Sequence, residues 1–264
     1  TMQLDILVHE AAQLTLFAQR QSMTNPLTHF WLKLDSGMHR LGFAAAEYAA
    51  ALAALRALPW CASVTGMTHF ASADEPDNTL TAQQLACYDA TTANLSLDQH
   101  SFANSAALIA WPAARRGWLR PGLILYGVNP VAQALDLLPV MQLEGKVIAV
   151  KTLAAGESTG YNQRWQAQRD SLVAFVAAGY ADGYPITALN RSIVALHGQR
   201  VPVIGRVSMD TLAIDCTGLT APAIGDWVEL WGDTIPVADV AAAAGSIPYQ
   251  LLTSVSARVP RVLA

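Results

Sequence analysis

The first 130 residues alternate short apolar runs with longer segments of helical composition. A helix after each strand indicates a parallel sheet with helices outside it. About five strands are predicted, whereas a closed (β/α)8 barrel contains eight strands over roughly 250 residues. Two alternatives follow: an open, doubly wound sheet, or a barrel without its beginning. The predicted strands are Leu4–His9, Phe30–Leu34, Val64–Phe70, Gln99–Phe102 and Leu119–Val128, and the predicted helices cover Glu10–Gln21, the stretch from Ala44, and Ala82–Leu95.

After about Pro139 the pattern changes to short apolar or alternating runs separated by turn residues. This pattern predicts antiparallel strands in a small barrel or a sandwich. We therefore predict an α/β domain over residues 1–139 and a mainly antiparallel β domain over residues 140–264. The runs are Val140–Val150, Ser171–Val176, Ser192–Leu196, Val201–Val207, Leu212–Asp215 and Trp227–Leu230, with helical composition over Val237–Ala244 and Tyr249–Val255.

Composition limits the class of partner. Charged residues make up 14% of the chain and the formal net charge is −4, so neither nucleic acid nor an anionic membrane is expected as the main partner. Cys61, Cys87 and Cys216 contain no C-x-x-C spacing. We therefore expect neither a disulfide framework nor a metal site, and a reducing cytoplasm fits best. No apolar run approaches the ~18 residues that cross a bilayer.

The segment from His29 to Phe43 combines a strand with three charged side chains. Apolar and polar residues alternate along it, which places Lys33 and Asp35 together on the less apolar face. Ser36-Gly37 then ends the strand and carries Arg40 onto a loop. This cluster suits anion binding at the C-terminal rim of a barrel. A solvated strand end with a surface ion pair has the same pattern.

Four other polar positions are candidates, each with a purely structural alternative. Tyr161 lies in a polar loop and could serve as an acid or base, or simply pack. His69 ends a strand and could relay protons, or be a satisfied structural histidine. Arg120 is a fixed cation beside Pro121-Gly122, or one half of a surface salt bridge. Asn104-Ser105 resembles a helix N-cap, where backbone N–H groups bind phosphate well, but plain capping needs no ligand.

Taken together and in order along the chain, eight segments resemble bacterial alanine racemase, a fold-type III family that uses pyridoxal 5′-phosphate (PLP). The resemblance extends over the whole length and implies a (β/α)8 barrel that carries PLP, followed by a C-terminal β domain. It also implies a head-to-tail homodimer with composite active sites. The segments are WLKLDSGMHRLG, THFASADE, NSAA, LRPGLILYG, GESTGY, GYADGYP, GRVSMD and PYQLLTSVSARVPR.

The resemblance assigns roles around the proton-transfer site. Tyr161 matches the base that acts on the L-enantiomer from the partner subunit. His69 matches the residue that hydrogen-bonds to Arg120, and Arg120 matches the arginine that faces the pyridine nitrogen. Because an arginine holds its proton up to a pKa above ~12, the ring nitrogen is expected to stay largely unprotonated, which suppresses side reactions such as transamination.

The resemblance also assigns residues to the substrate and to the cofactor phosphate. Arg40 matches the residue that holds the substrate carboxylate, oriented by Lys33, which is often a carbamate in this family. The backbone of Met209, beside Asp210, matches a second carboxylate contact that comes from the partner chain. The phosphate cradle is matched by Ser105, Gly122, Leu123 and Tyr249.

One element of the family pattern has no counterpart. The chain has three lysines, at 33, 146 and 151, and none lies in the N-terminal motif that carries the family's Schiff-base lysine. Since the chain also opens almost directly in the apolar run Leu4–His9, we expect a further segment ahead of Thr1. Two alternatives to alanine racemisation stay open: a broader racemase for serine or lysine, and an inactive remnant that only binds ligand or dimerises. A decarboxylase is disfavoured, because a carboxylate is expected there in place of Arg120.

Overall fold

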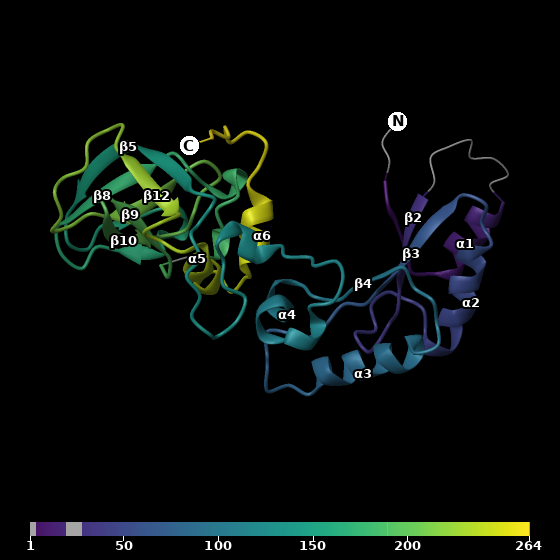
Figure 1. Ribbon diagram of the computed structural model, residues 1–264. Coiled ribbons are helices and arrows are strands. Elements are labelled where there is room, and N and C mark those ends of the chain that lie inside the picture. Colours follow the sequence, from purple (N-terminus) through teal and green to yellow (C-terminus); the bar gives the residue numbers. More distant parts are fainter. Residues whose placement is uncertain (1–3, 20–27, 189, 264) are drawn as a thin grey trace. The chain divides into compact units, whose positions relative to one another are not determined.

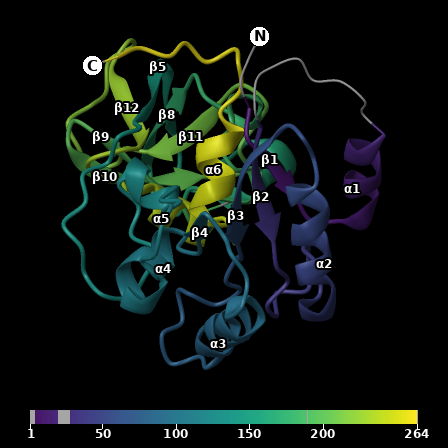
Figure 2. The same ribbon diagram turned by 45° about the vertical axis from the view of Figure 1, so that its right-hand side comes forward.

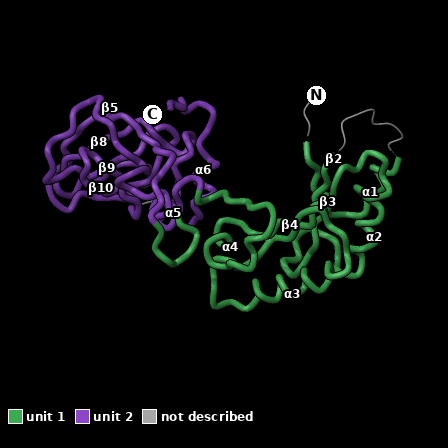
Figure 3. Tube along the Cα trace, viewed as in Figure 1, with its two compact units in different colours: residues 1–124, 129–135 green, residues 125–128, 136–264 purple. Residues whose placement is uncertain are grey.

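The computed structural model describes residues 4–19, 28–188 and 190–263 (Figure 1). The chain forms two compact units, which Figure 3 colours separately. The first unit comprises residues 1–124 and 129–135, and the second comprises residues 125–128 and 136–264. Neither unit contains, in its described residues, a helix long and apolar enough to cross a membrane.

The first unit is built on a parallel sheet with strand order β1-β2-β3-β4 (Figures 1 and 2). Each strand lies beside its predecessor, as in a (β/α)8 barrel, and the order does not reverse as in a doubly wound sheet. The predicted alternation of strand and helix is confirmed. Its elements are β1 (Ile6–Val8), α1 (Ala11–Ala18), β2 (Thr28–Lys33), α2 (Ala45–Arg56), β3 (Cys61–Met67), α3 (Leu80–Thr92), β4 (Gln99–Ser101) and α4 (Ser105–Ala110).

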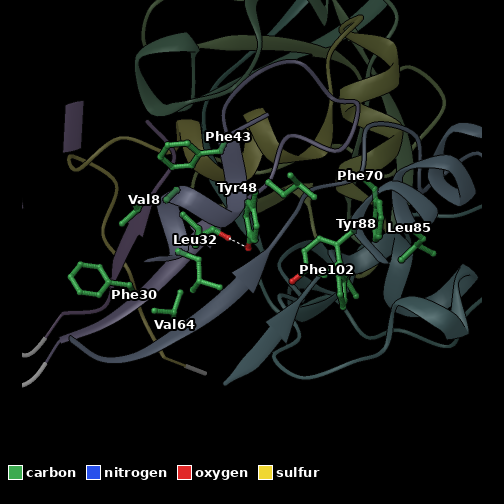
Figure 4. Close-up of a cluster of buried hydrophobic side chains, with 14 of the residues drawn as sticks. Val8, Phe30, Leu32, Phe43, Tyr48, Val64, Phe70, Leu85, Tyr88 and Phe102 are labelled. Atoms are coloured by element: carbon green, nitrogen blue, oxygen red, sulfur yellow. Dashed lines mark hydrogen bonds between the residues drawn. The ribbon is translucent and has the colours of Figure 1, made fainter. Parts of the chain in front are cut away.

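The core of the first unit lies between the sheet and its helices (Figure 4). Phe30 and Leu32 alternate along β2 and are fully buried, as are Tyr48 on α2 and Val64 on β3. A buried tyrosine needs a partner for its hydroxyl. Tyr48 Oη donates to the Leu32 carbonyl at 3.0 Å, so the apolar face of the sheet also fixes α2.

Gly66 on β3 lets two tyrosines approach the sheet. A Cβ at this position would overlap Tyr88 Oη and lie 2.6 Å from Leu97 Cδ1. We therefore expect Gly66→Ala to lower the free energy of unfolding by about 1–3 kcal/mol, measured by urea denaturation. A Cβ at Gly122 meets nothing within 4 Å, so Gly122→Ala is the matched control and should not destabilise. Equal stabilities for the two variants would show that overpacking is not the cause.

The predicted strand over Leu119–Val128 is wrong. An isolated parallel bridge from Ser101 to Trp118 comes just before this segment, and within the segment the chain forms a 3-10 helix over Leu123–Tyr126. Pro121 has no N–H to donate to a neighbouring strand, and Gly122 weakens a strand further. The described part of the first unit therefore has four strands rather than about five.

The second unit confirms the predicted antiparallel β domain, and of the two predicted forms it is a barrel rather than a sandwich. Its strands close in the order β10-β11-β8-β5-β12-β9. Closure leaves no free edge, and alternate residues of each strand fill the interior. A separate hairpin pairs β6 (Ser158–Thr159) with β7 (Trp165–Gln166). The other elements are β5 (Leu143–Leu153), β8 (Ser171–Val176), β9 (Ile193–Leu196), β10 (Gln199–Ile204), β11 (Leu212–Asp215), β12 (Trp227–Trp231), α5 (Val237–Ala243) and α6 (Pro248–Ser254).

Candidate functional site

Arg120 is a half-buried cation that is held by neutral groups. Its Nη2 donates to the carbonyls of Thr68 at 2.9 Å and Phe102 at 3.1 Å, and its Nη1 donates to Ser101 Oγ. In the described part of the chain it forms no salt bridge. Burial lowers the pKa of Arg120 to about 10, which still leaves it protonated at pH 7. The first unit therefore holds a rigid, permanent donor whose charge is not neutralised by a carboxylate.

His69 contacts this cation. Its Nδ1 lies 3.4 Å from Arg120 Nη2, and since a guanidinium can only donate, Nδ1 must be the acceptor and the ring proton must be on Nε2. Burial, together with the charges of Arg120, Lys33 and Arg40, lowers the pKa of His69 to about 4. His69 is therefore a neutral imidazole of fixed tautomer at physiological pH.

Protonation of His69 is expected to oppose folding between about pH 6.5 and pH 4. Because the pKa in the folded state is about 4 and the ordinary value is 6.5, the unfolded chain binds the proton first, and stability falls as the pH drops through this window. We expect a loss on the order of 1–3 kcal/mol in urea denaturation. His100, whose pKa is also lowered by burial, contributes with the same sign in all variants. His69→Gln should flatten the profile, and an unchanged slope would contradict the assignment.

Lys33 does not lie at a solvated strand end, which was the structural alternative for this segment. It is the last residue of β2 and only 4% exposed. Burial and the neighbouring Arg40 and Arg120 lower its pKa, against the opposing charge of Asp35. A buried amine with a lowered pKa is a better nucleophile and a weaker cation than a surface lysine.

The loop after β2 presents Arg40 at the surface. Asp35 Oδ1 accepts hydrogen bonds from the backbone N–H groups of Gly37 at 3.1 Å and His39 at 2.9 Å. Two hydrogen bonds of the bridge between Leu34 and Phe43 close the base of the loop: Asp35 N–H donates to the Phe43 carbonyl at 3.0 Å, and Phe43 N–H donates to the Lys33 carbonyl at 2.9 Å. Arg40 is thus an exposed cation on a loop of defined shape, near the buried Lys33.

Ser105 and Gly122 form a small polar cradle. Ser105 is 1% exposed, and its Oγ accepts hydrogen bonds from the N–H of Gly122 at 2.9 Å and of Ile124 at 3.4 Å. The predicted cap is confirmed, because Asn104 Oδ1 accepts from Ala107 N–H at 2.9 Å. Since an added Cβ at Gly122 would meet no atom within 4 Å, there is open space for a ligand beside these backbone donors. Leu123 is buried next to them.

Tyr161 projects from the tip of the β6–β7 hairpin in the second unit. Its side chain is 66% exposed. Gly160, Asn162 and Gln163 all adopt positive φ angles, which makes the turn tight. Asn190 joins this hairpin to the GRVSMD segment, which begins at Gly205. Its Nδ2 donates to the Arg164 carbonyl at 3.0 Å, and its Oδ1 accepts from Gly205 N–H at 2.6 Å.

Met209 and Asp210 lie on a loop that is locked to the GYADGYP motif. The carbonyls of Ser208 and Met209 accept from the N–H groups of Tyr180 and Ala181, both at 3.0 Å. Arg258 bridges the two motifs, with Nε 2.7 Å from Asp182 Oδ1 and Nη2 2.6 Å from Asp210 Oδ1. Met209 stays 52% exposed.

The predicted site residues are divided between the two units. In the first unit, the charges of Lys33, Arg40 and Arg120 act on His69. The cradle of Ser105, Gly122 and Leu123 belongs to the same unit. Tyr161, Met209, Asp210 and Tyr249, which is 46% exposed on α6, belong to the second unit.

Several polar partners were missed by the sequence analysis. The signal for two of them is position, because Thr68 and Ser101 stand at the C-terminal ends of β3 and β4, where barrel sites lie. The partners of Gln84, Asn190 and Arg258 are distant in sequence, so no local pattern identifies the contacts that these three side chains make.

Comparison with known proteins gives consistent results for both units. A family model described as "Alanine racemase, N-terminal domain" matches residues 1–130, and one described as "Alanine racemase, C-terminal domain" matches residues 140–263. A protein named alanine racemase from Stutzerimonas stutzeri is 47% identical over 98% of this chain and 72% of its own length.

Solved structures match the backbone as well. The biosynthetic alanine racemase from Pseudomonas aeruginosa superposes with a TM-score of 0.93 at 44% identity, over 98% of this chain and 73% of the other. The alanine racemase from Bartonella henselae with covalently bound pyridoxal phosphate has a TM-score of 0.83 at 29% identity, over 95% of this chain and 69% of the other.

Proposed function

Because this chain belongs to the alanine racemase family of PLP-dependent racemases, we propose that it interconverts L-alanine and D-alanine by a two-base mechanism. The observation that carries the proposal is the setting of Arg120, a half-buried cation with neutral hydrogen-bond partners and a neutral histidine at its side. A carboxylate in its place would favour protonated-ring chemistry and a different reaction.

The residues present fit the ring nitrogen and the phosphate of PLP, but none of the three lysines, at 33, 146 and 151, matches the family's Schiff-base position. Arg120 would face the pyridine nitrogen, while Ser105, Gly122 and Leu123 would hold the phosphate, for which the resemblance also assigns Tyr249. The open space beside the Gly122 backbone and the buried Ser105 hydroxyl support this placement. When bound, PLP supplies an electron sink that acidifies the α-carbon proton of an amino acid. Arg120 stays protonated at pH 7 and donates a hydrogen bond without giving up its proton.

The substrate carboxylate would be bound by Arg40 and by the backbone of Met209, beside Asp210. Lys33 would orient Arg40 as a carbamate, which the lowered pKa of its buried amine favours. In carbamylation the neutral amine adds to carbon dioxide, an N–C bond forms and the nitrogen loses one proton. The side chain then carries a negative charge and can accept a charge-assisted hydrogen bond from Arg40.

Tyr161 would act as the base for the L-enantiomer. Its exposure at the tip of a tight hairpin suits a residue that enters another subunit's site. The proposed assembly is a head-to-tail homodimer, in which residues 1–139 hold PLP and residues 140–264 lend Tyr161 and Met209 to the partner. We place this assembly in the cytoplasm, in keeping with three free cysteines.

The test is formation of D-alanine from L-alanine by the purified protein with PLP, detected with a D-specific oxidase. Serine and lysine in parallel assays separate an alanine racemase from a broader one. Turnover of alanine is expected to exceed that of both. If PLP added to the protein gives no visible absorption band and no D-amino acid forms, the proposal is wrong and the inactive alternative stands.

A further inference from the structure

Gln84 is a buried amide that no role proposed above uses. It lies on α3 and is 0% exposed, between the exposed Gln83 and the buried Leu85, which Figure 4 shows in the core. Burying an amide without hydrogen-bond partners costs about 1–3 kcal/mol. A buried glutamine in a helix is therefore informative about what it binds.

Its partners come from the two loops that carry the candidate site. Gln84 Oε1 accepts from Ala71 N–H at 3.0 Å, and Nε2 donates to the His69 carbonyl at 3.0 Å. The same Nε2 donates to Ser36 Oγ at 3.4 Å. Ser36 opens the loop that presents Arg40, whereas His69 and Ala71 follow β3.

The hydrogen bonds beyond Ser36 run in one direction. Thr68 Oγ1 donates to the Leu34 carbonyl at 3.1 Å, so in the 2.6 Å contact between Ser36 Oγ and Thr68 Oγ1 the serine must be the donor. This leaves a lone pair of Ser36 free to accept from Gln84. Since the Thr68 carbonyl also accepts from Arg120, the chain that begins at Gln84 ends beside the cation of the site.

We propose that Gln84 is a positioning residue, which locks the segment that holds His69 and Thr68 to the loop that presents Arg40. It holds the carboxylate-binding arginine in register with the Arg120–His69 pair. The catalytic part of this inference rests on the proposed function, whereas the mechanical part does not.

The experiment compares Gln84→Met with Gln83→Met. Both variants replace a glutamine of α3 with methionine. Gln83, however, is exposed, and its only side-chain hydrogen bond in the described residues is to Thr79. In the holoenzyme, Gln84→Met is expected to raise KM for L-alanine about tenfold and to lower kcat/KM by about 10- to 100-fold, as small misplacements do. Gln83→Met should leave both unchanged.

A second measurement needs no catalysis. Titration of His69 by NMR is expected to show a higher pKa in Gln84→Met than in the parent. Without the hydrogen bond from Gln84 to the His69 carbonyl, water can reach the imidazole and stabilise its charged form. Ser36→Ala removes the hydrogen bonds of Ser36 to Gln84 and to Thr68 but keeps the bond from Gln84 to the His69 carbonyl. It is expected to raise KM while leaving the His69 titration unchanged.

The outcomes separate the two proposals. If the pKa of His69 and KM are both unchanged in Gln84→Met, Gln84 is not a positioning residue. The same conclusion holds if the variant loses thermal stability while the pKa of His69 and KM stay as in the parent. If Gln84→Met fails to fold, an unchanged KM in Ser36→Ala overturns this role instead. If the parent itself racemises no amino acid, the proposed function fails, and the His69 titration still decides the mechanical part.

Discussion

Replacing Tyr161 with phenylalanine is expected to lower kcat for L-alanine by about 100- to 10,000-fold, the usual contribution of a positioned acid or base. The substitution removes one oxygen from a ring that is 66% exposed. The free energy of unfolding should therefore stay within ~0.5 kcal/mol of the parent, as for other surface changes. Coupled detection of D-alanine measures the first effect and urea denaturation the second.

Direction of transfer distinguishes the base from a binding residue. In deuterated water, Tyr161→Phe should slow exchange of the α-proton of L-alanine more than that of D-alanine. Tyr126→Phe is the control, since Tyr126 is also exposed (47%) and lies outside the proposed site. Equal slowing for both enantiomers would contradict the assignment of Tyr161 to one face.

Arg120→Ala is expected to affect both stability and activity. It leaves the carbonyls of Thr68 and Phe102 without their charged donor, which costs about 2–4 kcal/mol of unfolding free energy. Racemisation should fall by about 100- to 1,000-fold, as when a preorganised donor is removed. Because the Arg120 charge is one cause of the low pKa of His69, that pKa should rise toward 6.5 in the variant.

Arg120→Lys separates charge from geometry. The cation is kept but the planar fork is lost, so the pKa of His69 should change less than in Arg120→Ala while the hydrogen bonds to the two carbonyls cannot all be remade. Activity should be intermediate between the parent and the alanine variant. Full activity in Arg120→Ala would exclude Arg120 from the site.

The sequence predicted the elements whose pattern is local. Alternation of Phe30, Leu32 and Leu34 marked β2, and Asn104 marked the start of α4, because both signals lie within a few residues. The apolar composition of Leu119–Val128 led to the wrong prediction of a strand, because apolar content alone does not show that Pro121 and Gly122 prevent strand pairing. The parallel sheet and the antiparallel β domain followed from periodicity, but the number of parallel strands, the choice of a barrel over a sandwich and the closing order of the barrel did not.

The charged members of the site were predictable, and the neutral groups that hold them were not. Arg120, His69 and Lys33 stand in recognisable motifs. The Thr68 carbonyl is 52 residues from Arg120, and Gln84 is 48 residues from Ser36, so these contacts exist only once β2, β3 and α3 have packed. Gln84 shares a helix face with Leu85 and Tyr88, so its spacing indicates burial, but nothing in the sequence shows which groups its amide binds.

The one-way hydrogen bonds around Arg120 have an electrical consequence. The hydrogen bonds through Ser36 and Thr68 end at the Leu34 carbonyl, which cannot pass a proton on. Arg120 donates a hydrogen bond to His69 without transferring its proton. Neither route is a proton wire. The charge of Arg120 can therefore act electrostatically on a bound molecule, although the hydrogen bonds around it do not conduct protons. A deuteron abstracted from an amino acid has no path to solvent along these two routes.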